Sequence, residues 1–458
     1  MLAHCYFLYF FSAESTSFPR YIPKLKKKNT ILNSNTRYPL KKYLGYIKMI
    51  VNLPIKINNL YLKKHKKIVY SILFLSLCVF LFILNTSQPN NTVAIIKTPV
   101  KEAVKIPAPD LLARHSEKET KRIHFKLDSL LKRIHKRHDF NGAILVAKSD
   151  KIVYQNQVGT ADFKKKTALK KESTFQLASV SKQFTAAAIM LLKERNQIKL
   201  TDTVNTYFPD FPYAAVTIKN LLNHTAGLPK YFWIAEHKWQ EKKAPTNAEM
   251  IALLATSNVR RFFKPGRNFD YSNTGYFVLA SIVEKISGTS FSSFLETNIF
   301  EPLQMKNSYV YSFENDTIKE DQLAGYRLHR GWRHLKIRST VNDAIVGDKN
   351  VYTTAEDLYK WTLGLNTGKL LTKESLALMY SKGKTSYGRE IPYGFGFRID
   401  TKRQNSIYHY GKWNGFSTGL TSYLDDDLVI IVLEHTSYNA IKSLNNKIKH
   451  IVIDNFGV

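Results

Sequence analysis

Cysteine is nearly absent from this 458-residue chain, which contains only Cys5 and Cys78. Both lie outside the part of the chain that carries the motifs described below, so we expect no disulfide, zinc-ribbon site or cysteine nucleophile there. Spacing of the HExxH type is also missing, and we assign no metal. The folded part must then stand on its core alone, for which a hydrophobic content of 44% is ample.

Acidic residues are scarce as well, with 36 Asp and Glu against 68 Lys and Arg and a formal net charge of +32. Lysines far outnumber arginines and are scattered, whereas a nucleic-acid reader more often shows an arginine-rich stripe or a known motif. We therefore expect no nucleic-acid partner. Two explanations of the charge stay open: a lysine-biased, solvated surface, or attraction to anionic envelope polymers or lipid headgroups.

One long apolar run, residues 68–84, contains no charged residue and directly follows a lysine cluster at 63–67. Its length is short for a transmembrane helix and long for a signal peptide, and no small-residue cleavage site follows it. We predict an uncleaved single-pass anchor, with a cleaved signal and secretion as the alternative. Because the lysines precede the run, the rest of the chain is expected to be extracytoplasmic, in the periplasm.

The chain around this run is expected to lack a fold of its own. Residues 1–67 form a basic segment, predicted to be disordered or partly mis-annotated, because Met49 with its short basic lead resembles the start of an export signal. The true start is then either Met1 or Met49. Residues 85–120 contain four prolines without a helical or strand period and are predicted to be a tether. The folded domain is predicted to span 121–458.

Hydrophobic periodicity within that domain predicts strands at both ends and helices between them. Apolar residues at helical spacing open and close the domain, a hairpin pattern follows the first helix, and short β-type runs return before the last helix. These runs are 143–147, 151–155, 393–399, 406–411, 418–424 and 428–434. We predict an α/β (α+β) fold: an antiparallel sheet built from both ends of the domain, flanked by helices, with an inserted helical lobe.

The spacing Ser179-x-x-Lys182 stands at the start of a buried helical run. Ser179 would lie near the helix N-terminus, with Lys182 one turn later on the same side. A serine hydroxyl needs a neighbouring base, the helix end favours negative charge on its oxygen, and partial burial would lower the lysine pKa. Alone, this spacing more often marks a capping serine and a solvent-facing lysine.

Two further patterns follow in chain order. Tyr271-x-Asn273 can present a proton-exchanging hydroxyl and an amide from one side of a loop, although Asn273 could instead cap the next helix. Later, His409-x-Gly411 precedes Lys412 in a β-type run. A strand glycine lets a ligand approach the backbone, and the next amide can act as an oxyanion donor, but a lone strand histidine is usually a packed side chain.

Together and in this order, the three patterns resemble the signature of the serine β-lactamase and penicillin-binding protein superfamily. The likeness is closest to the branch of class C β-lactamases, D-Ala-D-Ala carboxypeptidases and related esterases, whose second motif carries Tyr. It extends over about residues 123–456 and includes LLNHTAGL at 221–228 and YGFGF at 393–397.

The resemblance implies catalytic roles for the first two motifs. Ser179 would form the acyl-enzyme, Lys182 and Tyr271 would share the work of general base and general acid, and Asn273 would position Lys182 and the substrate amide.

The resemblance also implies that the third motif binds substrate. His409 stands where many relatives carry Lys, Gly411 would make room for the substrate, and the backbone N–H groups of Ser179 and Lys412 would form the oxyanion hole. Relatives commonly have Thr or Ser in place of Tyr410 and a small residue in place of Lys412. We expect the bulk of Tyr410 to impair recognition of a substrate carboxylate, and the Lys412 side chain to replace that recognition.

The function implied by the resemblance is that of an extracytoplasmic serine hydrolase that forms a covalent acyl-enzyme and uses no cofactor. D-amino-acid peptides or cell-wall-derived compounds are the first choice of substrate, esters the second and β-lactams the third. The alternative from another class is a non-catalytic penicillin- or peptidoglycan-binding module anchored in the membrane.

Overall fold

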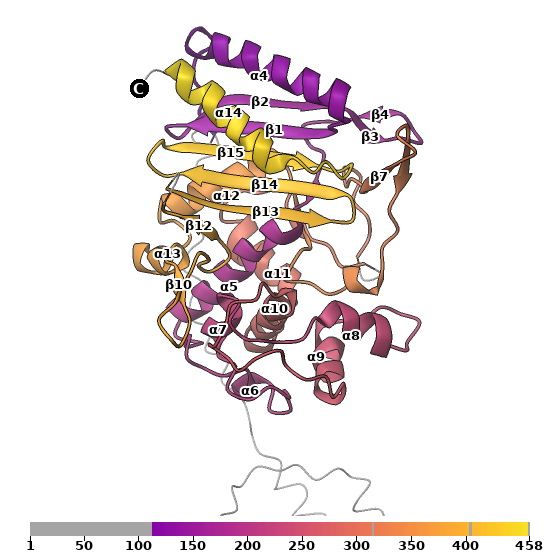
Figure 1. Ribbon diagram of the computed structural model, residues 1–458, viewed down its shortest axis with the longest axis vertical. Helices are drawn as coiled ribbons and strands as arrows, with labels where there is room; N and C mark the ends of the chain where they lie inside the picture. The colour runs from indigo at the N-terminus through magenta and orange to yellow at the C-terminus, as the bar shows by residue number, and fades with distance from the viewer. Residues whose placement is uncertain (1–111, 314–315, 403–404, 457–458) are drawn as a thin grey trace, which may run out of the picture. The chain divides into compact units, whose positions relative to one another are not determined.

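A six-stranded antiparallel sheet joins the two ends of the folded chain (Figure 1). The computed structural model describes residues 112–313, 316–402 and 405–456. β1 pairs with β15 from Gly142↔Glu434 to Lys148↔Leu428, so the first and last strands within the described residues are neighbours inside the sheet. The predicted fold class is confirmed. In spatial order, the strands are β12 (Arg398–Asp400), β13 (Ser406–Trp413), β14 (Phe416–Tyr423), β15 (Leu428–Glu434), β1 (Gly142–Lys148) and β2 (Lys151–Val158).

Two helices cover one face of this sheet: α4 (Glu117–His138) and α14 (Ile441–Phe456). Their apolar stripes are the ones expected from the sequence, and they pack on the aliphatic side chains of β1 and β15. The opposite face packs against α5 (Lys182–Glu194) and α12 (Ala355–Asn366), which belong to the larger core cluster.

The inserted lobe is helical, as predicted. Thr246 caps its helix through a capping box with Glu249, and Gly288, in the left-handed region at φ 70°, ends another helix. The lobe and its neighbours comprise α6 (Val204–Tyr207), α7 (Ile218–Leu222), α8 (Tyr231–Lys238), α9 (Asn247–Thr256), α10 (Asn273–Ser287), α11 (Phe291–Leu295), the π-helical turn η3 (Glu296–Phe300) and α13 (Lys373–Met379).

Short strands and turns connect these layers. They are β3 (Thr160–Asp162), β4 (Thr167–Ala168), β5 (Phe175–Gln176), η2 (Ala178–Ser181), β6 (Tyr309–Val310), β7 (Tyr326–His329), β8 (Arg333–Lys336), η4 (Val341–Asp343), β9 (Val351–Thr353), β10 (Gly383–Lys384) and β11 (Glu390–Ile391). Of these, β5, β9 and β6 form a separate three-stranded sheet that leads into η2.

The run at 393–399 is a strand only at its end, where β12 begins. Gly396 has a positive φ of 80°, and a Cβ there would lie 2.8 Å from Gln183 Cα and 2.9 Å from the Lys182 carbonyl oxygen. The expected strand is thus replaced by a glycine turn that packs on the backbone of α5. This turn holds β12 close to the Ser-x-x-Lys segment.

The folded domain begins earlier than predicted. Ser116 caps α4 in a capping box with Glu119, and Arg114 forms a β-bridge with Ile152. The boundary predicted at residue 121 therefore falls inside α4. The basic segment 1–67, the apolar run 68–84 and most of the expected tether lie outside the described residues. Within the part of the chain that the structure describes, no helix has the length and hydrophobicity needed to cross a membrane.

Candidate active site

The segment that carries Ser179 is held from two sides. The Leu177 N–H donates to the Val351 carbonyl at 2.8 Å, and the Thr418 hydroxyl donates to the Leu177 carbonyl at 2.7 Å. Between them, Ala178 has a φ of 48°, in the left-handed region that an alanine rarely occupies. Such local strain persists only where the surroundings impose it, and it directs the partly exposed Ser179 out of the turn that becomes α5.

Lys182 is fully buried behind Ser179. Its Nζ donates to Asn273 Oδ1 at 2.7 Å and to the Asp348 carbonyl oxygen at 2.8 Å, and it lies 3.3 Å from Ser179 Oγ. Burial lowers the pKa of Lys182 to about 8; the Asp348 carboxylate opposes this fall and Arg398 adds to it. The structure thus brings together Ser179, Lys182 and Asn273 from two different helices, with the lysine partly neutral near physiological pH.

Tyr271 lies next to Ser179 and Lys182. Lys182 Nζ lies 5.1 Å from the centre of its ring. Burial raises the pKa of the Tyr271 hydroxyl, while the nearby Ser179 hydroxyl lowers it without meeting the geometry of a hydrogen bond. Among the described residues, this buried hydroxyl has no hydrogen-bond partner. Since buried polar groups are nearly always paired, a free hydroxyl beside Ser179 is available to a reacting substrate.

His409 is buried and neutral rather than a substitute for a lysine. Its Nδ1 lies 2.9 Å from the Tyr410 carbonyl oxygen, which only accepts, so Nδ1 carries the hydrogen. Nε2 then accepts from the Tyr393 hydroxyl at 3.0 Å. Burial holds the pKa of His409 well below its usual value, and the positive charges of Lys182 and Arg398 lower it further. Its ring lies 5.9 Å from that of Tyr271, so it forms one wall of the site without a charge.

Gly411 serves the packing of β13. A Cβ at this position would lie 2.3 Å from the Leu177 carbonyl oxygen and 2.5 Å from Thr418 Oγ1. Only glycine therefore lets β13 lie against the segment that leads to Ser179. That Gly411 also makes room for a substrate stays a prediction.

Tyr410 and Lys412 lie on the opposite face of β13, because side chains alternate along a strand. Tyr410 packs against the cluster beneath α4 and α14, and Lys412 Nζ donates to Asn439 Oδ1 at 2.5 Å. The expectation that Tyr410 crowds the substrate and that the Lys412 side chain replaces carboxylate recognition is wrong for this reason. A role of the Lys412 backbone N–H as oxyanion donor stays a prediction.

Arg398, which the sequence analysis did not single out, supplies the charge. It begins β12, and its guanidinium carbon lies 5.2 Å from the ring centre of Tyr271 and 5.9 Å from that of Tyr393. In the described part of the chain, no carboxylate forms an ion pair with it. Its position directly after YGFGF was visible in the sequence, but nothing local indicated that the glycine turn aims it at Tyr271.

His224, in the LLNHTAGL segment at 221–228, supports the loop that carries Tyr271. The Ser272 N–H donates to His224 Nδ1 at 3.1 Å, and the imidazole lies 4.4 Å from the Tyr271 ring centre. Nδ1 is therefore an acceptor, and the hydrogen of this buried, neutral ring is on Nε2. The side chain fixes the loop on which Tyr271 and Asn273 stand.

A cavity of about 540 Å³ lies near the end of β13, with Gln176, Asp343 and Asn414 in its lining. None of the motif residues lines it. It neighbours the Ser179 segment through Gln176 but is separate from the group of Ser179, Lys182 and Tyr271.

Comparison with known proteins gives one consistent result. The family model described as "Beta-lactamase" matches residues 127–450. "Penicillin-binding protein 4*" of Bacillus subtilis (strain 168) is 34% identical over 329 residues, which are 69% of this chain and 72% of that protein. "Teichoic acid D-alanine hydrolase" of Staphylococcus aureus is 25% identical over 317 residues, or 69% of this chain and 74% of that protein.

Solved structures agree on the fold. A penicillin binding protein from Bacillus halodurans superimposes with a TM-score of 0.60 at 25% identity, covering 69% of this chain and 98% of that one. The D-amino acid amidase from Ochrobactrum anthropi SV3 has a TM-score of 0.59 at 21% identity, covering 73% and 99%. The resemblance predicted from the three motifs is confirmed. The chain belongs to the β-lactamase family of serine hydrolases.

Proposed function

We propose that the protein cleaves an amide or ester bond through a covalent acyl-enzyme on Ser179. One observation carries this proposal: a fully buried lysine with a pKa of about 8 lies 3.3 Å from the hydroxyl of a partly exposed serine. A base with a pKa near the working pH combines a useful neutral fraction with a strong pull on the proton. A capping serine with a solvent-facing lysine would not bury the lysine.

The proposed reaction has two stages, acylation of Ser179 and hydrolysis of the acyl-enzyme. Ser179 Oγ attacks the substrate carbonyl carbon as its proton passes to Lys182, and the oxyanion is held by the backbone N–H groups of Ser179 and Lys412. The proton reaches the departing amine or alcohol through the Tyr271 hydroxyl, and the bond to the leaving group breaks. Water then attacks the acyl-enzyme with the same groups as base and acid, which releases the acid and restores Ser179.

Arg398 supports a substrate with a carboxylate. Its guanidinium lies next to Tyr271 and has no carboxylate partner in the described chain, while His409 and the Lys412 side chain offer no charge to the site. A carboxylate at the end of the leaving group would be received there. This favours D-amino-acid peptides or cell-wall-derived compounds over neutral esters. A relative named as a teichoic acid D-alanine hydrolase and a neighbour named as a D-amino acid amidase support a D-amino-acid group in the substrate, whereas the carboxylate rests on Arg398 alone.

The proposal includes an extracytoplasmic location. It rests on the apolar run at 68–84 and the lysines before it, which lie outside the described residues. Protease added to spheroplasts should digest the catalytic domain. Full protection until the cells are lysed would place the domain on the other side of the membrane.

Labelling of the full chain tests the chemistry. A fluorescent penicillin or fluorophosphonate should attach to Ser179, and a panel of D-peptides, simple esters and β-lactams should rank the peptides with a free carboxylate first. The Ser179→Ala variant is the matched control. Absence of labelling and of turnover on the whole panel would leave the non-catalytic binding module as the function, and a preference for neutral esters would contradict the role given to Arg398.

A further inference from the structure

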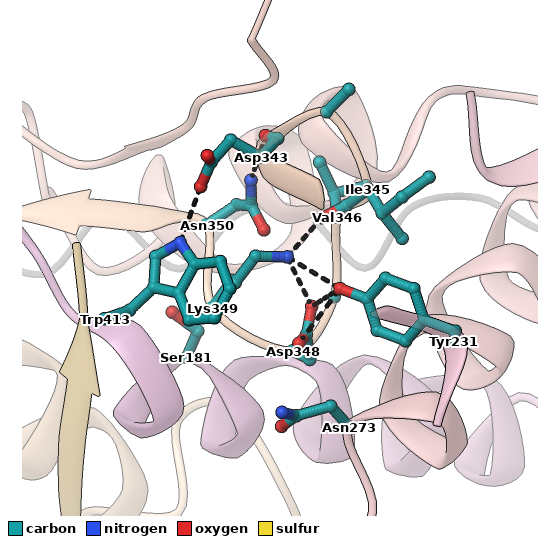
Figure 2. Close-up of polar contacts among 12 residues, drawn as sticks. Ser181, Tyr231, Asn273, Asp343, Ile345, Val346, Asp348, Lys349, Asn350 and Trp413 are labelled. Atoms are coloured by element: carbon teal, nitrogen blue, oxygen red, sulfur yellow. Dashed lines mark hydrogen bonds and ion pairs between the residues drawn. The ribbon is translucent and has the colours of Figure 1, made fainter. Parts of the chain in front are cut away.

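Asp348 and Lys349 form a buried ion pair next to Lys182, the candidate base. Figure 2 shows this pair with Tyr231. Lys349 Nζ lies 3.2 Å from Asp348 Oδ1, and it donates to the Tyr231 hydroxyl at 2.7 Å and to the Ile345 carbonyl oxygen at 3.1 Å. The Tyr231 hydroxyl donates in turn to both carboxylate oxygens of Asp348, at 3.1 and 3.2 Å. Asp348 is 0% exposed and Lys349 2% exposed. Every polar side-chain atom of this pair therefore has a partner inside the protein.

Burying an ion pair costs free energy, so the presence of this pair does not by itself indicate that it stabilises the fold. Removing two charges from water costs about as much as their attraction returns, and apolar residues of similar volume often serve stability as well or better. The aromatic rings of Phe232 and Trp413 lie 5.2 and 5.3 Å from Lys349 Nζ and shield it further from water. Its location next to the reaction site needs another explanation.

Asp348 connects the pair to Lys182 through its two ends. Its carboxylate points to Tyr231 and Lys349, while its backbone carbonyl accepts the hydrogen bond from Lys182 at 2.8 Å. Its chain neighbours are held as well: the Val351 N–H donates to Ser181 Oγ at 3.1 Å, and Asn350 Nδ2 donates to the Asp343 carbonyl at 2.9 Å.

The Asp348 carbonyl decides where the lone pair of the base points. A neutral amine has two N–H groups and one lone pair. Asn273 Oδ1 and the Asp348 carbonyl accept from Lys182 Nζ at 2.7 and 2.8 Å, so both N–H groups have a partner. The remaining direction faces Ser179 Oγ, which is the atom that must lose its proton. Without this carbonyl, the lysine could rotate its lone pair away.

Charge couples the two lysines through the same residue. Burial lowers the pKa of Lys182, and the Asp348 carboxylate raises it. Burial also lowers the pKa of Lys349. The Asp348 carboxylate opposes this fall, and the positive charge of Lys182 adds to it. The other titratable or charged groups that face this pair of lysines are Tyr231 on α8, Tyr271 before α10, Tyr276 on α10, Asp343 on η4, Arg398 on β12, and the neutral rings of His224 and His409.

We propose that Lys349 is a positioning residue for the base: together with Tyr231 it holds Asp348 so that its carbonyl orients Lys182, and it balances the Asp348 carboxylate that would otherwise keep Lys182 charged. This inference rests on the proposed function, because it assigns Lys182 the role of base. The charge of Lys182 then depends on Asp348 and Lys349, which belong to none of the three motifs.

The test is the pH dependence of kcat/KM in three variants of the full chain. The base must be neutral to react, so kcat/KM should rise with pH as Lys182 loses its proton. The position of this rising limb follows the pKa of Lys182. In Lys349→Met the unbalanced carboxylate should move this limb to higher pH by on the order of one unit. In Asp348→Asn the limb should move to lower pH, because the Asp348 carboxylate, which raises the pKa of Lys182, is lost. The double variant should return close to the native limb.

Lys360→Met is the matched control. It removes another ion pair with a buried carboxylate, Lys360 Nζ to Asp357 Oδ1 at 2.6 Å, and involves no motif residue. Its melting temperature should fall without movement of the limb. Loss of activity in Lys349→Met with an unmoved limb would show a purely structural pair and overturn the inference.

Failure of Lys349→Met to fold and failure of the proposed function can be told apart from failure of this inference. If Lys349→Met does not fold, Asp348→Asn and the double variant decide: an unmoved limb in Asp348→Asn overturns the inference. Labelling of the native chain at Ser179 is measured in parallel. Labelled native protein with unmoved limbs refutes only the role of Lys349, whereas an unlabelled and inactive native chain refutes the proposed function itself.

Discussion

The two faces of the six-stranded sheet bury different kinds of side chain. Beneath α4 and α14 the buried cluster is made of aliphatic and aromatic residues, and the polar groups buried beside it include Asn445 of α14 and Glu434 at the end of β15. On the other face, beside a larger apolar core, the structure buries Lys182, Asp348, Lys349 and two neutral histidines. Burial of apolar groups is favourable without partners, while each buried charge needs several. The reactive groups therefore cost stability, and apolar burial on both faces offsets that cost.

The sharpest way to separate the faces is to remove the reactive groups. Ser179→Ala and Lys182→Ala should each lower turnover by roughly 10⁴-fold or more, and the double variant should be hardly worse, because parts of one catalytic unit are non-additive. Steady-state kinetics on the best substrate of the panel measures this. The melting temperature should change little, and a Ser179→Ala variant with near-native turnover would refute the assignment.

The opposite face should respond in the opposite manner. Leu127, which is 2% exposed between α4 and the sheet, fills a purely apolar site. Leu127→Ala should lower the free energy of unfolding by about 2–5 kcal/mol, from lost burial and a residual cavity. Denaturant unfolding measures the loss, and kcat per folded molecule should stay native. A large fall in kcat at full folding would mean that the two faces are not independent.

Tyr271→Phe tests whether an orphan hydroxyl belongs to the reactive set. The change keeps the ring that packs on His224 and Lys182 and deletes only the oxygen without a partner. Turnover should fall by roughly a hundredfold while stability is unchanged or slightly improved, because an unsatisfied buried group is removed. Equal losses of turnover and melting temperature would instead indicate a structural role.

The smallest expected effect concerns Arg398. Arg398 also lowers the pKa of Lys182, so both proteins are compared at a pH above the rising limb, where Lys182 is neutral in each. There Arg398→Gln should raise KM by about tenfold for substrates with a free carboxylate and leave kcat/KM for their neutral amides nearly unchanged. Paired assays on a D-peptide and its C-terminal amide measure the difference. Equal effects on both substrates would remove the carboxylate from the proposed function.

The polar face was the harder one to predict. The first helix of the domain and the hairpin after it follow from local periodicity, and the structure has α4 and the β1–β2 hairpin there. The sequence did not indicate that Lys349 would be buried, since a lysine is usually solvated. Its partner Tyr231 is 118 positions away in the chain, on α8. No local pattern joins two such residues.

The amino-acid sequence by itself determined the fold class, because amphipathic periods are properties of neighbouring residues. The three motifs in chain order, through their resemblance to a known family, singled out Ser179, Lys182, Tyr271 and Asn273. Only the tertiary structure decided which charges face the site. The glycine turn at Gly396 brings Arg398 over Tyr271, and both ring nitrogens of His409 are paired inside the protein. These arrangements depend on contacts between distant segments and on burial, which set pKa values and hydrogen-bond partners only once the chain has folded.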